Sequence, residues 1–198
     1  MNLAQVLRTA PDAPSAFQSD RRRSAELYAD ILAVAPGGDG RVDVEAVQSR
    51  PSILRRTAAL LSEALPPGTD RLVCAAPDGI ATTTALALHT GLPFATVTGT
   101  GDDARLTGEA HAGEHTVVVV PLMSTARDAA PPVLAALKAG MRVSHVLSVV
   151  DSTDSTDSTD NSTDSTDTSS VADTLLEQYE VGFHALFSAT EKKEVDPR

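Results

Sequence analysis

The sequence predicts an α/β fold, in which a central parallel sheet is flanked by helices. Short apolar runs suited to buried strands alternate with segments of helical periodicity along most of the 198 residues. Glycine or proline separates the two kinds of segment. The connections are long enough to hold the crossover helices that parallel strands require. With 41% hydrophobic and 3% aromatic residues, the core must be built mainly from Ala, Val and Leu.

Helices dominate the expected N-terminal part. We expect residues 1–40 to form a helical arm or hood, with apolar positions near helical spacing over residues 24–34. Residues 41–44 alternate apolar and polar, as an edge strand does. Pro51 suits the first turn of a helix that runs to residue 65. The buried side of this helix is predicted to comprise Ile53, Leu54, Ala58, Leu60 and Leu61.

Strands and helices then alternate through a predicted α/β core over residues 41–150. Strands are expected at residues 71–76, 94–97, 115–120 and 143–150, and helices at residues 80–89 and 131–139. Gly91 and Gly140 end the two helices. A further helix and a last strand within residues 171–198 complete the core. Strands separated in this way favour a parallel sheet covered on both faces.

Residues 151–170 differ from the rest, because they repeat Asp, Ser and Thr with one Asn. This tract has no apolar side chain to bury, so we predict a disordered surface loop. Its six Asp contribute about half of the net charge of −11, and that acidity argues against a nucleic-acid partner.

The expected setting is the cytoplasm. Cys74 is the one cysteine, so no internal disulfide forms, and its apolar neighbours predict a buried side chain. Residues 1–16 lack the basic start and apolar run of a signal peptide. No run of about 18 apolar residues predicts a membrane span. The five histidines show no ligand spacing, so no metal site is predicted.

Two stretches resemble the orotate phosphoribosyltransferase family. Residues 72–81, continued by an Ala/Leu-rich helix and by Gly91, Leu92 and Pro93, are similar to the family's strand, glycine-bearing loop, helix and "GLP" turn. Residues 115–129 stand where the family carries its motif for phosphoribosyl pyrophosphate (PRPP). The similarity spans roughly residues 42–190. It implies a Rossmann-like type I phosphoribosyltransferase fold with a small N-terminal hood, and a homodimer.

The chemical residues of that family are largely replaced. Pro121 and Leu122 stand at its acidic pair, which holds the ribose hydroxyls, and neither side chain accepts a hydrogen bond. The turn at residues 125–129 lacks both glycines of the family's phosphate-binding turn. Residues 98–104 are short and acidic where the family has a cationic catalytic loop, and Arg105 is the cation that remains. Leaving pyrophosphate needs positive charge, so catalysis is predicted to be impaired.

Ligand binding is nevertheless predicted at two loops, while no residue is predicted to be catalytic. The expected phosphate- or nucleotide-binding residues are Ala76, Pro77, Asp78, Gly79, Ser124, Thr125, Ala126, Arg127, Asp128 and Arg105. The first loop precedes a helix N-terminus with hydroxyls at Thr82, Thr83 and Thr84, a pattern that suits an anion. Asp78 either caps that helix, the simpler interpretation, or coordinates Mg²⁺ on a ligand.

Three functions remain open from the sequence. The leading hypothesis is a pseudoenzyme of nucleotide metabolism that binds a nucleotide, PRPP or a related phosphate, or that regulates. The second is an active transferase that joins orotate to PRPP with Mg²⁺ and releases pyrophosphate. The third is a structural partner subunit with an empty pocket.

Overall fold

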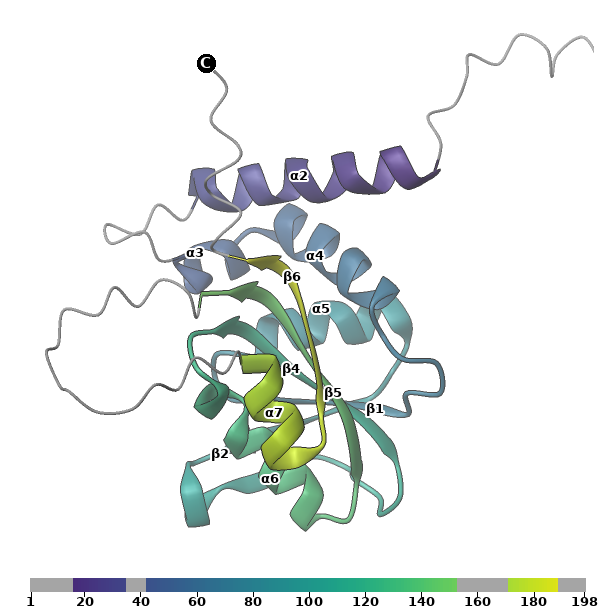
Figure 1. Cartoon of the computed structure of the whole chain (residues 1–198), viewed down its shortest axis with the longest axis vertical. Helices are drawn as coiled ribbons and strands as arrows, with labels where there is room; N and C mark the ends of the chain where they lie inside the picture. The colour runs from purple at the N-terminus through teal and green to yellow at the C-terminus, as the bar shows by residue number, and fades with distance from the viewer. Residues whose placement is uncertain (1–15, 35–41, 153–170, 189–198) are drawn as a thin grey trace, which may run out of the picture.

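A six-stranded sheet forms the centre of the molecule, with strand order β3-β2-β1-β4-β5-β6 (Figure 1). The computed structural model describes residues 16–34, 42–152 and 171–188. All neighbouring strands are parallel except β3, which pairs antiparallel with β2. The strands are β1 (Arg71–Ala75), β2 (Phe94–Thr98), β3 (Arg105–Thr107), β4 (His115–Met123), β5 (Arg142–Asp151) and β6 (Gly182–Ser188).

Helices cover both faces of the sheet, as the sequence predicts. α4 and α5 lie on one face, while α6 and α7 lie on the other (Figure 1). Two short 3₁₀ turns, η1 (Gly101–Asp103) and η2 (Ala126–Asp128), lie in the loops after β2 and β4. The described helices are α2 (Ala16–Val34), α3 (Val44–Gln48), α4 (Pro51–Glu63), α5 (Ile80–Thr90), α6 (Ala130–Lys138) and α7 (Val171–Tyr179).

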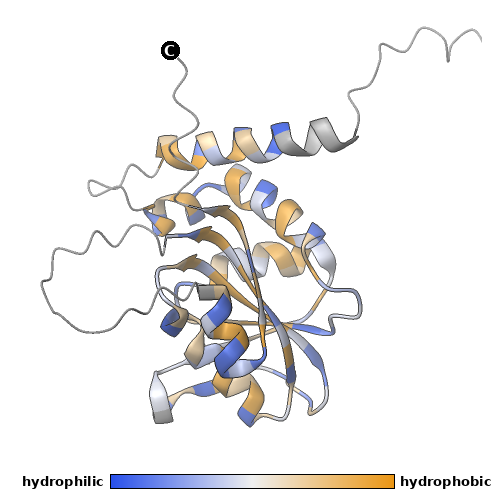
Figure 2. Cartoon of the chain, viewed as in Figure 1, coloured by the Kyte–Doolittle hydropathy of each residue, from blue (hydrophilic) through white to orange (hydrophobic). Residues whose placement is uncertain are grey.

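Strand β4 shows why the apolar runs are continuous. Val117 and Val119 belong to the core under α4 and α5, whereas Val118 and Val120 belong to the core under α6 and α7. Because successive side chains of a strand point to opposite faces, a strand buried on both sides needs apolar residues throughout. Apolar residues follow the strands and the helix faces that meet them (Figure 2).

Helix α2 is an integral layer of the first core. Leu27 and Ile31 are fully buried, and the Tyr28 ring stacks on Phe187 of β6 with centroids 4.9 Å apart. The helix runs across α4 (Figure 1) and begins at Ala16, eight residues before the periodicity predicts. The part of the expected arm formed by residues 1–15 lies outside the described residues.

One strand prediction is wrong, and one strand was missed. The described residues 42–44 of the expected edge strand do not form one: Val42 makes an isolated bridge and Val44 already starts α3. The Asp43 carboxylate accepts a hydrogen bond from the Ala46 N–H at 3.0 Å, so an N-cap overrides the alternating pattern. Strand β3 was not predicted, because three residues are too few for a periodic signal.

The other elements agree with prediction to within a few residues. Strands β4 and β5 run on to Met123 and Asp151, three residues and one residue further than expected. Of the Asp-Ser-Thr segment, residues 153–170 lie outside the described part of the chain. No described helix is long and apolar enough to cross a membrane.

A partly buried ion pair joins β1 to the segment before β4, at the amino ends of the strands. Arg71 Nε donates to Glu114 Oε2 at 2.7 Å and Arg71 Nη2 donates to Oε1 at 3.0 Å. The two side chains are 6% and 18% exposed. The hydrogen bonds from Arg71 lower the pKa of Glu114 to about 2. This bidentate pair should stabilise the fold far from any ligand site.

We predict that Glu114→Gln lowers the free energy of unfolding by about 2 kcal/mol at neutral pH, because Arg71 loses its charged partner. The Glu114 pKa lies below its unfolded value of about 4.3, so the stabilisation is complete above about pH 5 and is lost as pH falls toward 2. Urea unfolding across this range should show wild type and variant converging. Glu63→Gln, at a half-exposed pair with Arg23, is the control and should change stability by less than about 0.5 kcal/mol. A constant difference at every pH would contradict the assignment.

Candidate functional site

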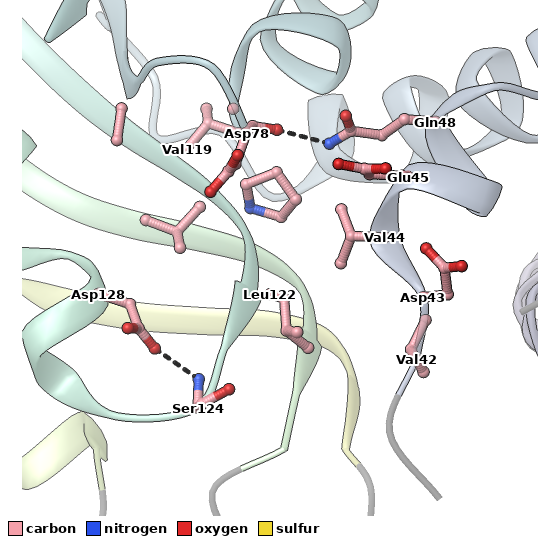
Figure 3. Close-up of a pocket in the computed structure, with 14 residues that line it drawn as sticks. Val42, Asp43, Val44, Glu45, Gln48, Asp78, Val119, Leu122, Ser124 and Asp128 are labelled. Atoms are coloured by element: carbon pink, nitrogen blue, oxygen red, sulfur yellow. Dashed lines mark hydrogen bonds between the residues drawn. The ribbon is translucent and has the colours of Figure 1, made fainter. Parts of the chain in front are cut away.

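A cavity of about 460 Å³ lies at the carboxyl ends of β1 and β4, where parallel α/β sheets hold their ligands (Figure 3). Three parts of the chain enclose it: the segment through α3, the loop after β1, and the end of β4 with the turn that follows. Its lining residues are Val42, Asp43, Val44, Glu45, Gln48, Ala75, Asp78, Gly79, Val119, Val120, Pro121, Leu122, Ser124 and Asp128.

Helix α3 forms one wall and is tied to the loop after β1. The side-chain amide of Gln48 donates to the backbone carbonyl of Asp78 at 2.7 Å and to the Thr82 hydroxyl at 3.2 Å. The first of these bonds is drawn in Figure 3. The sequence did not predict these wall residues, since residues 41–44 looked like a strand. An Asp directly before Val44 and Glu45 was the N-cap signal that could have located the helix.

The loop after β1 is shaped by packing. Gly79 is buried, and a Cβ there would lie 2.6 Å from Cys74 Cβ and 2.8 Å from the Ala75 carbonyl oxygen. The Ala76–Pro77 peptide bond is cis. Cys74 is fully buried as predicted, and burial raises the pKa of its thiol, so it stays protonated near neutral pH. Because the loop approaches β1 so closely at residue 79, the structure requires glycine at that position.

The start of α5 differs from the predicted anion site. Gly79 occupies the N-cap position and no side chain caps the helix, so the expected cap at Asp78 is wrong. Thr82 and Thr83 are 2% and 0% exposed, and neither Thr83 nor Thr84 lines the cavity. The Thr82 hydroxyl meets Gln48 instead of a ligand. Asp78 itself is exposed and faces the cavity (Figure 3).

Strand β4 carries Pro121 and Leu122 to the cavity wall. β1 pairs with β4 only as far as Val119, so a proline without an N–H is tolerated where one neighbouring strand has ended. Pro121 is buried, and Leu122 packs against the first core while pairing with Val150 of β5. Neither side chain offers an oxygen to a ribose hydroxyl.

The turn after β4 is closed by its own carboxylate. Asp128 Oδ2 accepts hydrogen bonds from the backbone N–H groups of Ser124, at 2.7 Å, and of Thr125, at 2.8 Å. The Thr125 hydroxyl accepts the Asp128 N–H in return, which completes a capping box around η2. Two N–H groups at the cavity edge are thus occupied from within the chain (Figure 3 shows the Ser124 bond).

A short hairpin stands where the resemblance places a cationic loop. β2 and β3 pair from Thr96↔Thr107 to Thr98↔Arg105, and η1 closes the turn between them. Gly99 has φ +80°, and a Cβ there would lie 2.6 Å from the Asp103 carbonyl oxygen, so glycine is needed at this tight turn. Arg105 is exposed on this hairpin and does not line the cavity.

The charge of the cavity is negative. Four carboxylates line it, from Asp43, Glu45, Asp78 and Asp128, and no Arg, Lys or His is among its described lining residues. Two unit charges 4 Å apart interact by about 1 kcal/mol in water and about 4 kcal/mol at an effective dielectric of 20. The wall therefore opposes an anion without a counter-ion. In the described part of the chain no group of three His, Cys, Asp or Glu side chains is placed to hold a metal.

The predicted binding residues divide into two groups. Asp78, Gly79, Ser124 and Asp128 line the cavity together. The other six predicted residues, which do not line it, are Ala76, Pro77, Thr125, Ala126, Arg127 and Arg105. Which of the ten contact a ligand remains a prediction.

Solved structures of known proteins share the fold of this chain. No protein-family model and no curated protein matches the chain. Among solved structures, a phosphoribosyltransferase from Corynebacterium diphtheriae has a TM-score of 0.68 at 18% identity, covering 86% of this chain and 98% of its own. Orotate phosphoribosyltransferase of Mycobacterium tuberculosis H37Rv in complex with PRPP has a TM-score of 0.66 at 15% identity, covering 86% and 91%. The corresponding enzyme from Aeropyrum pernix has 0.61 at 17% identity, covering 79% and 85%.

The chain therefore has the fold of the type I phosphoribosyltransferases, as the sequence resemblance predicts. Within that class its structure is similar to those of orotate phosphoribosyltransferases over most of their length. At sequence identities of 15–18% the similarity to these structures shows the fold alone. The function of the site therefore has to be inferred from the side chains that line the cavity.

We predict that Gly79→Ala lowers the free energy of unfolding by about 1 to 3 kcal/mol, because the new methyl group overlaps Cys74 and Ala75. Gly68→Ala is the control, since its Cβ meets nothing within 4 Å. Its cost should be about 1 kcal/mol, from a φ of +82° alone. Urea unfolding measures both variants. A smaller loss for Gly79→Ala than for Gly68→Ala would show that packing does not require this glycine.

Proposed function

We propose that the chain is a catalytically impaired phosphoribosyltransferase homologue of nucleotide metabolism, which binds a small molecule in its cavity and acts as a binding or regulatory protein. The observation that carries the proposal is the lining of the cavity: four carboxylates and no cation among the described residues. A type I fold with this lining keeps the ligand space and lacks the charge that transfer to or from PRPP needs.

Two independent features of the cavity oppose turnover. Breaking the bond to pyrophosphate builds negative charge on the leaving group, and preorganised cations or Mg²⁺ must stabilise it. The hairpin between β2 and β3 brings no cation to the cavity, since Arg105 does not line it. In addition, Pro121 and Leu122 cannot hold the ring hydroxyls of the sugar through their side chains. Either loss alone would lower the rate. Together they leave the ribose hydroxyls without side-chain acceptors from β4 and the departing pyrophosphate without a cation.

The size and the mixed lining of the cavity support ligand binding. At about 460 Å³ the cavity falls in the range of about 300 to 1,000 Å³ that is typical of pockets for small molecules. Its walls combine apolar side chains from β4 with carboxylate oxygens, and Gln48 holds one wall against the other. Such a mixture can bury a base or sugar and accept its hydrogen bonds.

A working transferase is the second candidate, and the fold it shares with an orotate phosphoribosyltransferase crystallised with PRPP favours it. Asp78 is exposed at the cavity and would be the residue of this chain to meet Mg²⁺ carried in by PRPP. A homodimer, implied by the family resemblance, would then have to supply the missing cations from the second copy.

We predict that the purified chain forms no orotidine monophosphate above background from orotate, PRPP and Mg²⁺, because no described side chain that lines the cavity is a cation that could neutralise the leaving pyrophosphate. An active orotate phosphoribosyltransferase under the same conditions is the positive control. Isothermal titration with PRPP, orotate, orotidine monophosphate and the uncharged nucleoside uridine tests binding separately. Product formation that scales with protein concentration would overturn the proposal, and binding of no ligand in this series would contradict the proposed binding role.

A further inference from the structure

The turn after β4 lies at the place where the fold would receive a phosphate. It follows a central parallel strand, at the cavity edge, and two of its backbone N–H groups point to one spot. Such N–H groups suit a phosphate oxygen, because they bring partial positive charge without a side chain. In this chain a single carboxylate oxygen, Asp128 Oδ2, already occupies that spot.

Asp128 Oδ2 accepts short hydrogen bonds from residues of its own turn. Both hydrogen bonds fall in the range of charge-assisted bonds, at 2.7 Å from the Ser124 N–H and 2.8 Å from the Thr125 N–H. The Thr125 hydroxyl accepts from the Asp128 backbone and holds the residue in place. A phosphate that entered here would have to displace a tethered anion, whose effective concentration is high, and then lie beside it.

The remaining carboxylates favour a different ligand. Asp43, Glu45 and Asp78 present oxygens that accept hydrogen bonds and repel anions. They come from α3 and from the loop after β1, on the other walls of the cavity (Figure 3). Hydroxyl and amine groups of a ligand would find acceptors there. With Pro121 and Leu122 forming an apolar wall, the lining suits a sugar and a base better than a phosphate.

We propose that the Asp128 carboxylate is a built-in substitute for a ligand phosphate, so that the cavity takes a phosphate-free, hydroxyl-bearing ligand such as a nucleoside in preference to the 5′-phosphate of that nucleoside. The inference rests on the proposed function in that it takes this cavity as the ligand site. Asp128 is thereby a specificity-determining residue, since it decides whether the turn is open to an anion.

The test uses two ligands that differ only by the phosphate, uridine and uridine 5′-monophosphate, titrated into the full chain by calorimetry. Wild type should bind uridine, which carries no charge, more tightly. Asp128→Ala empties the turn and should raise the affinity for the monophosphate by about tenfold or more, with less than about threefold change for uridine. Asp128→Asn keeps an oxygen for both N–H groups and should give only part of this gain.

Asp78→Asn is the matched control, because it removes one cavity charge and frees no backbone N–H. A gain for Asp128→Ala no larger than for Asp78→Asn would overturn the proposal, as would a wild type that prefers the monophosphate. Thermal melting checks that the variants fold, and Asp128→Ser, too short to reach both N–H groups, replaces Asp128→Ala should the latter unfold. Turnover by wild type would sink the proposed function and leave this comparison standing. A failed Asp128 comparison would leave the absence of turnover untouched.

Discussion

The pairing of β4 with β5 continues after β1 has ended, and the cavity is shaped by this difference in length. β1 pairs with β4 only to Cys74↔Val119, whereas β5 pairs with it as far as Met123↔Asp151. The end of β4 is therefore bare on one side and rigid on the other. Pro121 and Leu122 lie beyond the last residue of β4 that pairs with β1, and they line the cavity. The turn follows at Ser124, because β4 ends at Met123. The register of the two strands thus decides which residues face a ligand.

The same register fixes which side chains of β4 reach the cavity. A strand fixed by a neighbour cannot twist to bring other side chains to the cavity, so its last residues must be suited to the ligand by identity. Here they are apolar, and the polar groups of the cavity come from α3 and its N-cap, from Asp78, and from the turn of residues 124–128. All the charged ones are carboxylates. The fold forms the cavity, and carboxylates from three separate segments make the charge of its lining negative.

Much of this architecture is readable from the sequence, because buried parallel strands leave an unmistakable pattern. The valines of β4 predict a strand covered on both faces, and Gly91 at φ +78° ends α5 where predicted. The resemblance to orotate phosphoribosyltransferases was also visible in the order of elements. What fails are features set by single side chains: Asp43 starts a helix where alternation indicates a strand, and the three residues of β3 are held by their pairing with β2.

The candidate site was predicted only in part for the same reason. The loops after β1 and β4 were found, since their position follows from the fold. The contacts that their residues make within the chain were not predicted, because these contacts join separate segments or cross a turn. Gly79 serves packing against Cys74, Thr82 serves Gln48, and Asp128 serves the N–H groups of its own turn. In the sequence Asp128 looks like a charge that repels phosphate from outside, whereas in the structure its Oδ2 accepts the backbone N–H groups of Ser124 and Thr125. A sequence shows which groups are present in a loop, and only the fold shows which of them are already satisfied by one another.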